Sequence, residues 1–217
     1  MNKKKWLFLS VFLLVTSVVF TFLVKTFDVR PVGPEGSLVG FASLNSSVHE
    51  FLGENPAFGT VTDVFLGVAF LSVPIFLLIG LRELFKEKSL KKVEKSLFVL
   101  GAFYCFVALV FVLFEHFVVN FRPILMDGVL EPSYPSSHTL LSICLAFSAS
   151  IEASLLLEDS RKKSLVWTFS WVVALIVVVG RLISGVHWTT DILGGVLISA
   201  TLLSFFKFAL ACLPEKS

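Results

Sequence analysis

The feature that most constrains this chain is a series of six apolar blocks, each about 20 residues long, separated by short polar stretches. A helix of about 20 residues crosses a hydrocarbon core about 30 Å thick. Of the 217 residues, 56% are hydrophobic and 16% are charged, whereas soluble domains are about half apolar and a quarter charged. A soluble chain of this length has too little interior for so many apolar side chains. The sequence therefore predicts an all-α, polytopic membrane protein.

We expect six transmembrane helices in a single transmembrane domain that covers residues 1–217. The expected spans are about 6–24, 60–81, 97–120, 138–157, 165–184 and 189–211. The first block follows three lysines, as the apolar segment of a signal peptide does. Its length of about 19 residues and the lack of a small-x-small cleavage site near Lys25 favour an uncleaved helix.

The distribution of lysine and arginine predicts the orientation of the chain, because cytoplasmic loops are enriched in both. Of the 18 lysines and arginines, all but four fall in the segments that share a side with the termini, including the C-terminal Lys207 and Lys216. The four on the other side are Lys25, Arg30, Arg122 and Arg181. We therefore expect both termini in the cytoplasm, and the composition suggests a bacterial-type inner or plasma membrane.

The first outer segment, about 25–59, contains a short amphipathic stretch. One helical face carries apolar side chains at Leu44, Val48, Phe51 and Leu52. Ser47 and Glu50 have the spacing of a capping box, and Gly53 is a suitable stop. We expect a short helix in the outer interface, which serves either as a lid over the bundle or as a gate for lipid entry.

Several classes of site have little support in the sequence. The three cysteines (Cys105, Cys144, Cys212) lie inside apolar blocks without metal-type spacing, so we interpret them as packing residues. A zinc site needs several His, Cys or carboxylate ligands. Besides His138, His187 and Asp191, only Glu115 and His116 are nearby candidates. We expect no metal, no other cofactor and no nucleic-acid partner, and the sequence leaves the oligomeric state open.

Three polar stretches, at residues 120–123, 134–138 and 180–191, stand where the outer ends of spans three to six should meet. Pro135 interrupts the chain, so Ser136 or Ser137 is expected at the N-cap of the fourth span, with His138 in the first turn. Free amide groups and the positive end of the helix dipole favour an anion there. Arg122 and Arg181 add two guanidiniums, and the combination suits a phosphate.

His187 and Asp191 are four residues apart, which places both on one face of a helix. A carboxylate beside an imidazole fixes its tautomer and stabilises its cation. We interpret His187 as an oriented nucleophile and His138 as a proton donor to a leaving oxygen. Each stretch alone is more typical of an interface anchor, a helix start or a polar surface pair; their common side and order favour a catalytic site.

These residues resemble a known family. Arg122-Pro123, Pro135-Ser136-Ser137-His138 and Arg181-x5-His187-x3-Asp191 resemble the three signature motifs of the type 2 phosphatidic acid phosphatase superfamily. The resemblance covers residues 60–210 in topology and 115–191 in detail. It implies a lipid phosphate phosphatase with six spans, an outward-facing site and no metal.

The resemblance also implies a role for each matched residue. His187 forms a phosphohistidine, Asp191 supports His187, and His138 protonates the leaving oxygen. The phosphoryl oxygens are held by Arg122, Arg181, Ser136 and Ser137.

The chain departs from the family pattern at Glu115, where the first motif has a lysine seven residues before Arg122. A carboxylate near the membrane is expected either to be protonated or to pair with Arg122 or Arg181. Two milder departures are Ser137, where glycine is frequent, and Gly180, where serine is frequent.

We therefore expect metal-independent hydrolysis of a lipid phosphate or diphosphate at the outer leaflet. The substrates that the resemblance implies are a polyprenyl diphosphate, phosphatidylglycerol phosphate, phosphatidate and diacylglycerol diphosphate. The alternatives are a non-catalytic lipid-phosphate binder or transporter, suggested by Glu115, and a lipid phosphotransferase, since a phosphohistidine can react with alcohols as well as with water.

Overall fold

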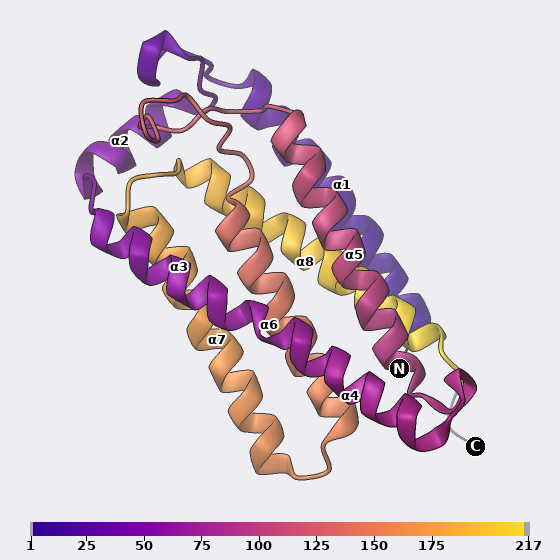
Figure 1. Ribbon diagram of the computed structural model, residues 1–217. Helices are drawn as coiled ribbons and strands as arrows, with labels where there is room; N and C mark the ends of the chain where they lie inside the picture. The colour runs from indigo at the N-terminus through magenta and orange to yellow at the C-terminus, as the bar shows by residue number, and fades with distance from the viewer. Residues whose placement is uncertain (1, 215–217) are drawn as a thin grey trace.

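The computed structural model describes residues 2–214 and shows a bundle of helices (Figure 1). The α-helices are α1 (Lys3–Thr26), α2 (Ala42–Leu52), α3 (Pro56–Phe70), α4 (Ser72–Glu87), α5 (Lys95–His116), α6 (Ser137–Leu156), α7 (Ser160–Ile183) and α8 (Thr189–Cys212). Two single-turn helices, η1 (Pro34–Gly36) and η2 (Leu90–Lys92), lie in the connections. Within the described part of the chain, β-pairing is limited to isolated bridges.

Within residues 2–214, six helical segments are long and apolar enough to cross a membrane, which confirms the predicted all-α fold with six spans. The second of them runs over residues Pro56–Glu87 and is longer than the predicted 60–81. It is divided at Leu71, whose amide donates to the Val68 carbonyl at 3.2 Å in a tightened turn. Pro74 has no N–H to donate to the Phe70 carbonyl, which explains the break at this point.

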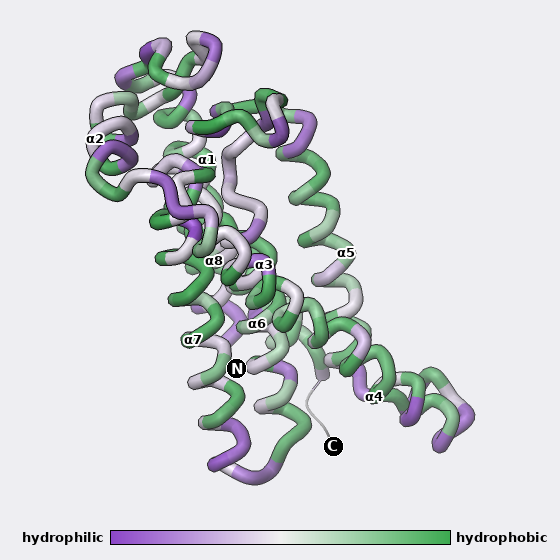
Figure 2. Tube along the Cα trace, turned by 60° about the vertical axis from the view of Figure 1, so that its left-hand side comes forward, coloured by the Kyte–Doolittle hydropathy of each residue, from purple (hydrophilic) through white to green (hydrophobic). Residues whose placement is uncertain are grey.

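Helices α6 and α8 form the interior of the bundle and carry most of its buried residues. The outer helices expose large apolar side chains, such as Phe8, Phe85 and Leu109, as a lipid-facing surface requires. Figure 2 shows apolar residues along the helices and hydrophilic ones gathered toward the two ends of the bundle. Interhelical hydrogen bonds also join outer helices to inner ones. The Ser17 and Thr201 hydroxyls lie 2.9 Å apart between α1 and α8.

The predicted short helix of the first outer segment is present as α2, but its start differs from the prediction. It begins at Ala42, after Phe41, so Ser47 is not an N-cap and the predicted capping box with Glu50 is wrong. The Ser47 hydroxyl instead donates to the Ser43 carbonyl one turn earlier. Gly53 ends the helix with a positive φ of 65°, and the glycine is the expected stop. The interfacial position of α2 stays a prediction.

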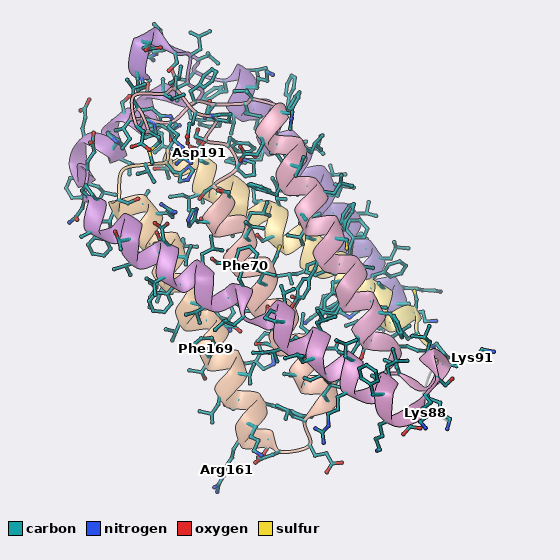
Figure 3. The ribbon with its side chains drawn as sticks, viewed as in Figure 1. Phe70, Lys88, Lys91, Arg161, Phe169 and Asp191 are labelled. Carbon is teal, nitrogen blue, oxygen red and sulfur yellow. The ribbon has the colours of Figure 1, made fainter. Side chains whose placement is uncertain are left out.

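The two ends of the bundle differ in charge. Figure 3 shows Lys88, Lys91 and Arg161 at one end and Asp191 near the other. Figure 1 places the start of α1 and the end of α8 at the same end as these basic residues. The predicted basic side of the chain is therefore one physical end of the bundle, although Lys216 lies outside the described residues.

Candidate active site

The three polar stretches meet at the end of the bundle that holds Asp191. The segment between α5 and α6 folds back on itself there: the Arg122 amide donates to the Glu131 carbonyl, and the Ser133 amide donates to the Asn120 carbonyl, both at 3.0 Å. The Ser136 amide then donates to the Asp191 carbonyl at 3.0 Å. The second and third polar stretches are therefore joined directly through the backbone.

Ser136, one of the two predicted candidates, is the N-cap of α6. Its hydroxyl oxygen accepts hydrogen bonds from the Thr139 hydroxyl at 3.1 Å and the Thr139 amide at 3.5 Å. The helix begins at Ser137, and His138 lies in its first turn. The amides of Ser137 and His138 are too early in the helix for intrahelical acceptors, so this end suits an anion. Ser137 lines a cleft that it shares with Arg122 and His187.

His187 and Asp191 are neighbours, but not in the way predicted. Helix α8 begins at Thr189, so His187 lies in the preceding loop, and the prediction of a shared helical face is wrong. The His187 Nδ1 and Asp191 Oδ2 atoms are 3.8 Å apart, an ion-pair distance longer than a hydrogen bond. Asp191 also caps its own helix, because Oδ2 accepts a hydrogen bond from the Trp188 amide at 2.9 Å. Both side chains are buried.

The surroundings of His187 favour its neutral form. Burial lowers the pKa of His187 well below its usual 6.5, and the positive charges of Arg122 and Arg181 lower that pKa further. The Arg122 Nη1 atom lies 3.4 Å from His187 Nε2. Because a guanidinium has only donors, Nε2 is the acceptor and carries the lone pair, and the proton resides on Nδ1, which faces Asp191.

A residue that sequence reasoning missed, Asp63 of α3, joins His138 and Arg181. Its Oδ1 atom lies 2.8 Å from His138 Nε2 and 2.7 Å from Arg181 Nη2. The Arg181 side chain is 6% exposed and the Asp63 side chain 61% exposed. The available signal was that Asp63 is the single charged residue of the expected span 60–81, since charges inside spans are costly and usually functional.

The predicted pairing of Glu115 with either arginine is not the arrangement found. Arg122 pairs instead with Glu131, with Nε and Oε2 3.0 Å apart, and Arg181 pairs with Asp63. Glu115 is exposed on the last turn of α5 and lines the same cleft as Arg122 and His187.

Asn120 is a second residue whose role the sequence analysis missed. It is buried, its Nδ2 group donates to Asp191 Oδ1 at 3.3 Å, and its Oδ1 accepts from the Gly40 amide at 3.2 Å. Asn45 of α2 binds the same region, donating to the Gly40 carbonyl at 2.8 Å and to the Thr190 hydroxyl at 2.9 Å. The first outer segment thus braces the start of α8, where Asp191 lies.

Among residues 2–214, no group of three or more His, Cys, Asp or Glu side chains is arranged to hold a metal ion. Cys144 is buried, and Cys105 and Cys212 are exposed.

The fold and these contacts define a polytopic helical membrane protein with two histidines and two arginines gathered at one end of its bundle. The family model described as PAP2 superfamily matches residues 97–211, more than half of the chain. The chain belongs to this superfamily, which confirms the resemblance drawn from its three motifs. No curated protein matches the sequence significantly.

A solved structure also resembles this chain. It is the structure of the first transmembrane PAP2 type phosphatidylglycerolphosphate phosphatase from Bacillus subtilis, and it aligns with a TM-score of 0.67 at 19% identity. The alignment covers 96% of this chain and 100% of that one. At this identity the likeness shows the fold, and it supports a multi-pass membrane protein.

The contacts of Asn120 predict that it positions Asp191. Asn120→Ala removes the hydrogen bond to the buried carboxylate, so we expect kcat for phosphate release to fall about 10- to 100-fold, with a smaller change in KM. Asn2→Ala, at the opposite end of the bundle, is the matched control. Steady-state kinetics of both variants test this role, and an Asn120→Ala enzyme with wild-type kcat would contradict it.

Proposed function

We propose that this protein hydrolyses a lipid phosphate or diphosphate at the extracytoplasmic face of a bacterial-type inner or plasma membrane, through a phosphohistidine and without a metal. The observation that carries the proposal is that His187 is buried and neutral, with a cation on one side and a carboxylate on the other. A buried, neutral imidazole presents Nε2 to a guanidinium at 3.4 Å and Nδ1 to a carboxylate at 3.8 Å. Such an arrangement suits a nucleophile that attacks an anionic phosphorus centre.

In the proposed first step, the His187 Nε2 lone pair attacks phosphorus and the bond from phosphorus to the lipid oxygen breaks. Asp191 stabilises the imidazolium that results, and His138 gives a proton to the leaving oxygen. Arg122, Arg181 and the N-terminal turn of α6, with Ser136 and Ser137, hold the phosphoryl oxygens. Charge stabilisation is then the main catalytic contribution.

In the second step, His138 accepts a proton from water as the water oxygen attacks the phosphohistidine. The bond from phosphorus to His187 Nε2 breaks, and inorganic phosphate leaves. His138 thereby regains the proton that it gave up, so both histidines return to their starting states.

The distribution of charge supports an extracytoplasmic site. Lys88, Lys91 and Arg161 lie at the end opposite Asp191 (Figure 3), and basic residues accumulate on the cytoplasmic side of membrane proteins.

The lining of the cleft supports a lipid substrate. Phe111, Phe114 and Leu140 line it together with Arg122 and His187, so apolar side chains lie directly beside the charged and catalytic ones. Because the similar Bacillus subtilis structure is that of a phosphatidylglycerolphosphate phosphatase, phosphatidylglycerol phosphate is the first substrate to test, followed by a polyprenyl diphosphate and phosphatidate.

A second candidate function, lipid-phosphate binding or transport without catalysis, is favoured by one observation: both arginines are already paired with carboxylates, and Glu115 adds a third acidic group to the cleft. A phosphotransferase that passes the phosphoryl group from His187 to an alcohol uses the same first step. The products distinguish the three functions: the hydrolase releases inorganic phosphate, the phosphotransferase forms a phosphorylated alcohol, and the binder forms neither.

The central experiment measures phosphate release by the purified protein from these lipids, with and without a chelator. We expect release that is insensitive to the chelator. His187→Ala removes the nucleophile and should reduce release by at least about 10³-fold, by analogy with the loss of a nucleophile in other covalent mechanisms. His116→Ala is the matched control, because His116 is exposed at the end of α5.

Equal turnover by the His187→Ala variant would rule out the mechanism. Binding of the lipids that requires Arg122 and Arg181, without phosphate release, would support the binder. A phosphorylated alcohol as the main product would support the phosphotransferase.

Glu115 allows a separate test of the cleft. If Glu115 simply repels the phosphate, Glu115→Lys should lower KM or raise kcat, about tenfold in kcat/KM, because a nearby charge is reversed. If Glu115 takes part in the reaction, the substitution should impair both constants. Because the side chain lines the cleft beside Arg122, we expect the first result, and steady-state kinetics distinguish the two.

A further inference from the structure

Asp63 occupies an unusual place for a carboxylate in a site that is proposed to bind an anion. A single oxygen, Oδ1, contacts both His138 Nε2 at 2.8 Å and Arg181 Nη2 at 2.7 Å. These are the two groups that a phosphoryl or leaving-group oxygen would need. Asp63 comes from α3, which contributes no residue to the three motifs. An internal carboxylate therefore already holds the contacts that the substrate requires.

The surroundings of Asp63 show that the contact is built into the packing of α3 against α7. Gly180 lies next to Arg181, and a Cβ atom there would overlap the methyl group of the buried Thr62, next to Asp63. The third motif of the family frequently has serine at this position. The glycine therefore permits the close approach of the two helices that brings Asp63 to Arg181.

The Asp63 side chain is the most exposed member of this group. Its exposed fraction is 61%, whereas that of the Arg181 side chain is 6% and that of the His138 side chain is 22%. The cation and the imidazole are thus held inside the protein, while the carboxylate lies at the exposed edge of the site. An outward rotation of Asp63 would therefore leave the buried core of the bundle intact.

Electrostatics requires such a movement if a phosphate is to bind. A phosphate dianion within hydrogen-bond distance of Arg181 and His138 would lie against the Asp63 charge, and like charges at contact distance repel strongly in a partly buried site. Arg122, the second guanidinium of the site, is also paired with a carboxylate. Its partner is Glu131, whose side chain is likewise the more exposed of the two, at 45%.

On this basis, and building on the proposed function, we infer that Asp63 is a specificity-determining residue: it holds the phosphoryl-oxygen position in the resting enzyme, and the substrate phosphate displaces it. Affinity for any phosphate is then lowered by the contacts that must be broken. Inorganic phosphate, which gains nothing from a lipid tail, is the most disfavoured ligand, so the product leaves readily. A lipid phosphate offsets the cost through its tail.

The test uses the full-length protein in detergent micelles and inorganic phosphate as the probe. Asp63→Asn keeps the shape of the side chain but removes its charge, and Asp63→Ala removes both. Charge-assisted hydrogen bonds are about twice as strong as neutral ones, so we expect both variants to bind phosphate about tenfold more tightly than the wild type in titration calorimetry. Glu50→Gln, at an exposed carboxylate of α2, should leave this affinity unchanged.

Kinetics supply the second readout. With a lipid that the wild type hydrolyses, KM and the inhibition constant for phosphate should both fall in Asp63→Asn. Phosphate binding that is no tighter in either variant overturns the inference. A loss of kcat with unchanged phosphate affinity also overturns it, because Asp63 would then be a permanent partner of His138.

The two proposals fail separately. Tighter phosphate binding by the variants, without hydrolysis of any lipid by the wild type, supports the inference and refutes the proposed function. Hydrolysis of a lipid by the wild type, without tighter phosphate binding by the variants, supports the proposed function and refutes the inference about Asp63.

Discussion

The backbone and side chain of Asp191 join the three polar stretches of the site. Its carbonyl accepts a hydrogen bond from the Ser136 amide. Its carboxylate accepts hydrogen bonds from the Trp188 amide and the Asn120 side chain, and it faces His187. The group is fully buried, so each of these contacts is made in a low-dielectric environment where an unpaired carboxylate would be costly. These contacts hold together two segments, at Asn120 and Asp191, that are more than 70 residues apart in the chain.

The close approach of α6 and α8 makes these contacts possible. A Cβ atom at Gly194 would overlap the ring of Tyr134, and Gly195 lies against Thr139 in the first turn of α6. The Tyr134 hydroxyl in turn lies 2.8 Å from the Thr21 hydroxyl of α1. In a membrane, where apolar surfaces gain little by leaving lipid for protein, small residues and interhelical hydrogen bonds of this kind supply much of the association. The site therefore rests on the two most buried helices.

Much of this arrangement follows from local sequence patterns. The six spans, the N-cap at Ser136 and the helix end at Gly53 each depend on hydropathy or on a single turn, and the structure has them. The errors arise where tertiary contacts compete with local rules, as in the start of α2 and the loop position of His187. The pairing of Arg181 with Asp63 links residues on two helices, and a single sequence carries no signal of their distance.

The central claim, that His187 is the nucleophile of a phosphoryl transfer, is tested most directly by trapping the intermediate. The purified protein is mixed with a lipid labelled in its terminal phosphate, quenched under alkaline conditions that preserve phosphohistidine, and digested for mass spectrometry. The account predicts a stoichiometric, acid-labile phosphoryl group on His187 during turnover. Turnover with the label on another residue, or with no labelled protein at any time in the burst phase, would contradict it.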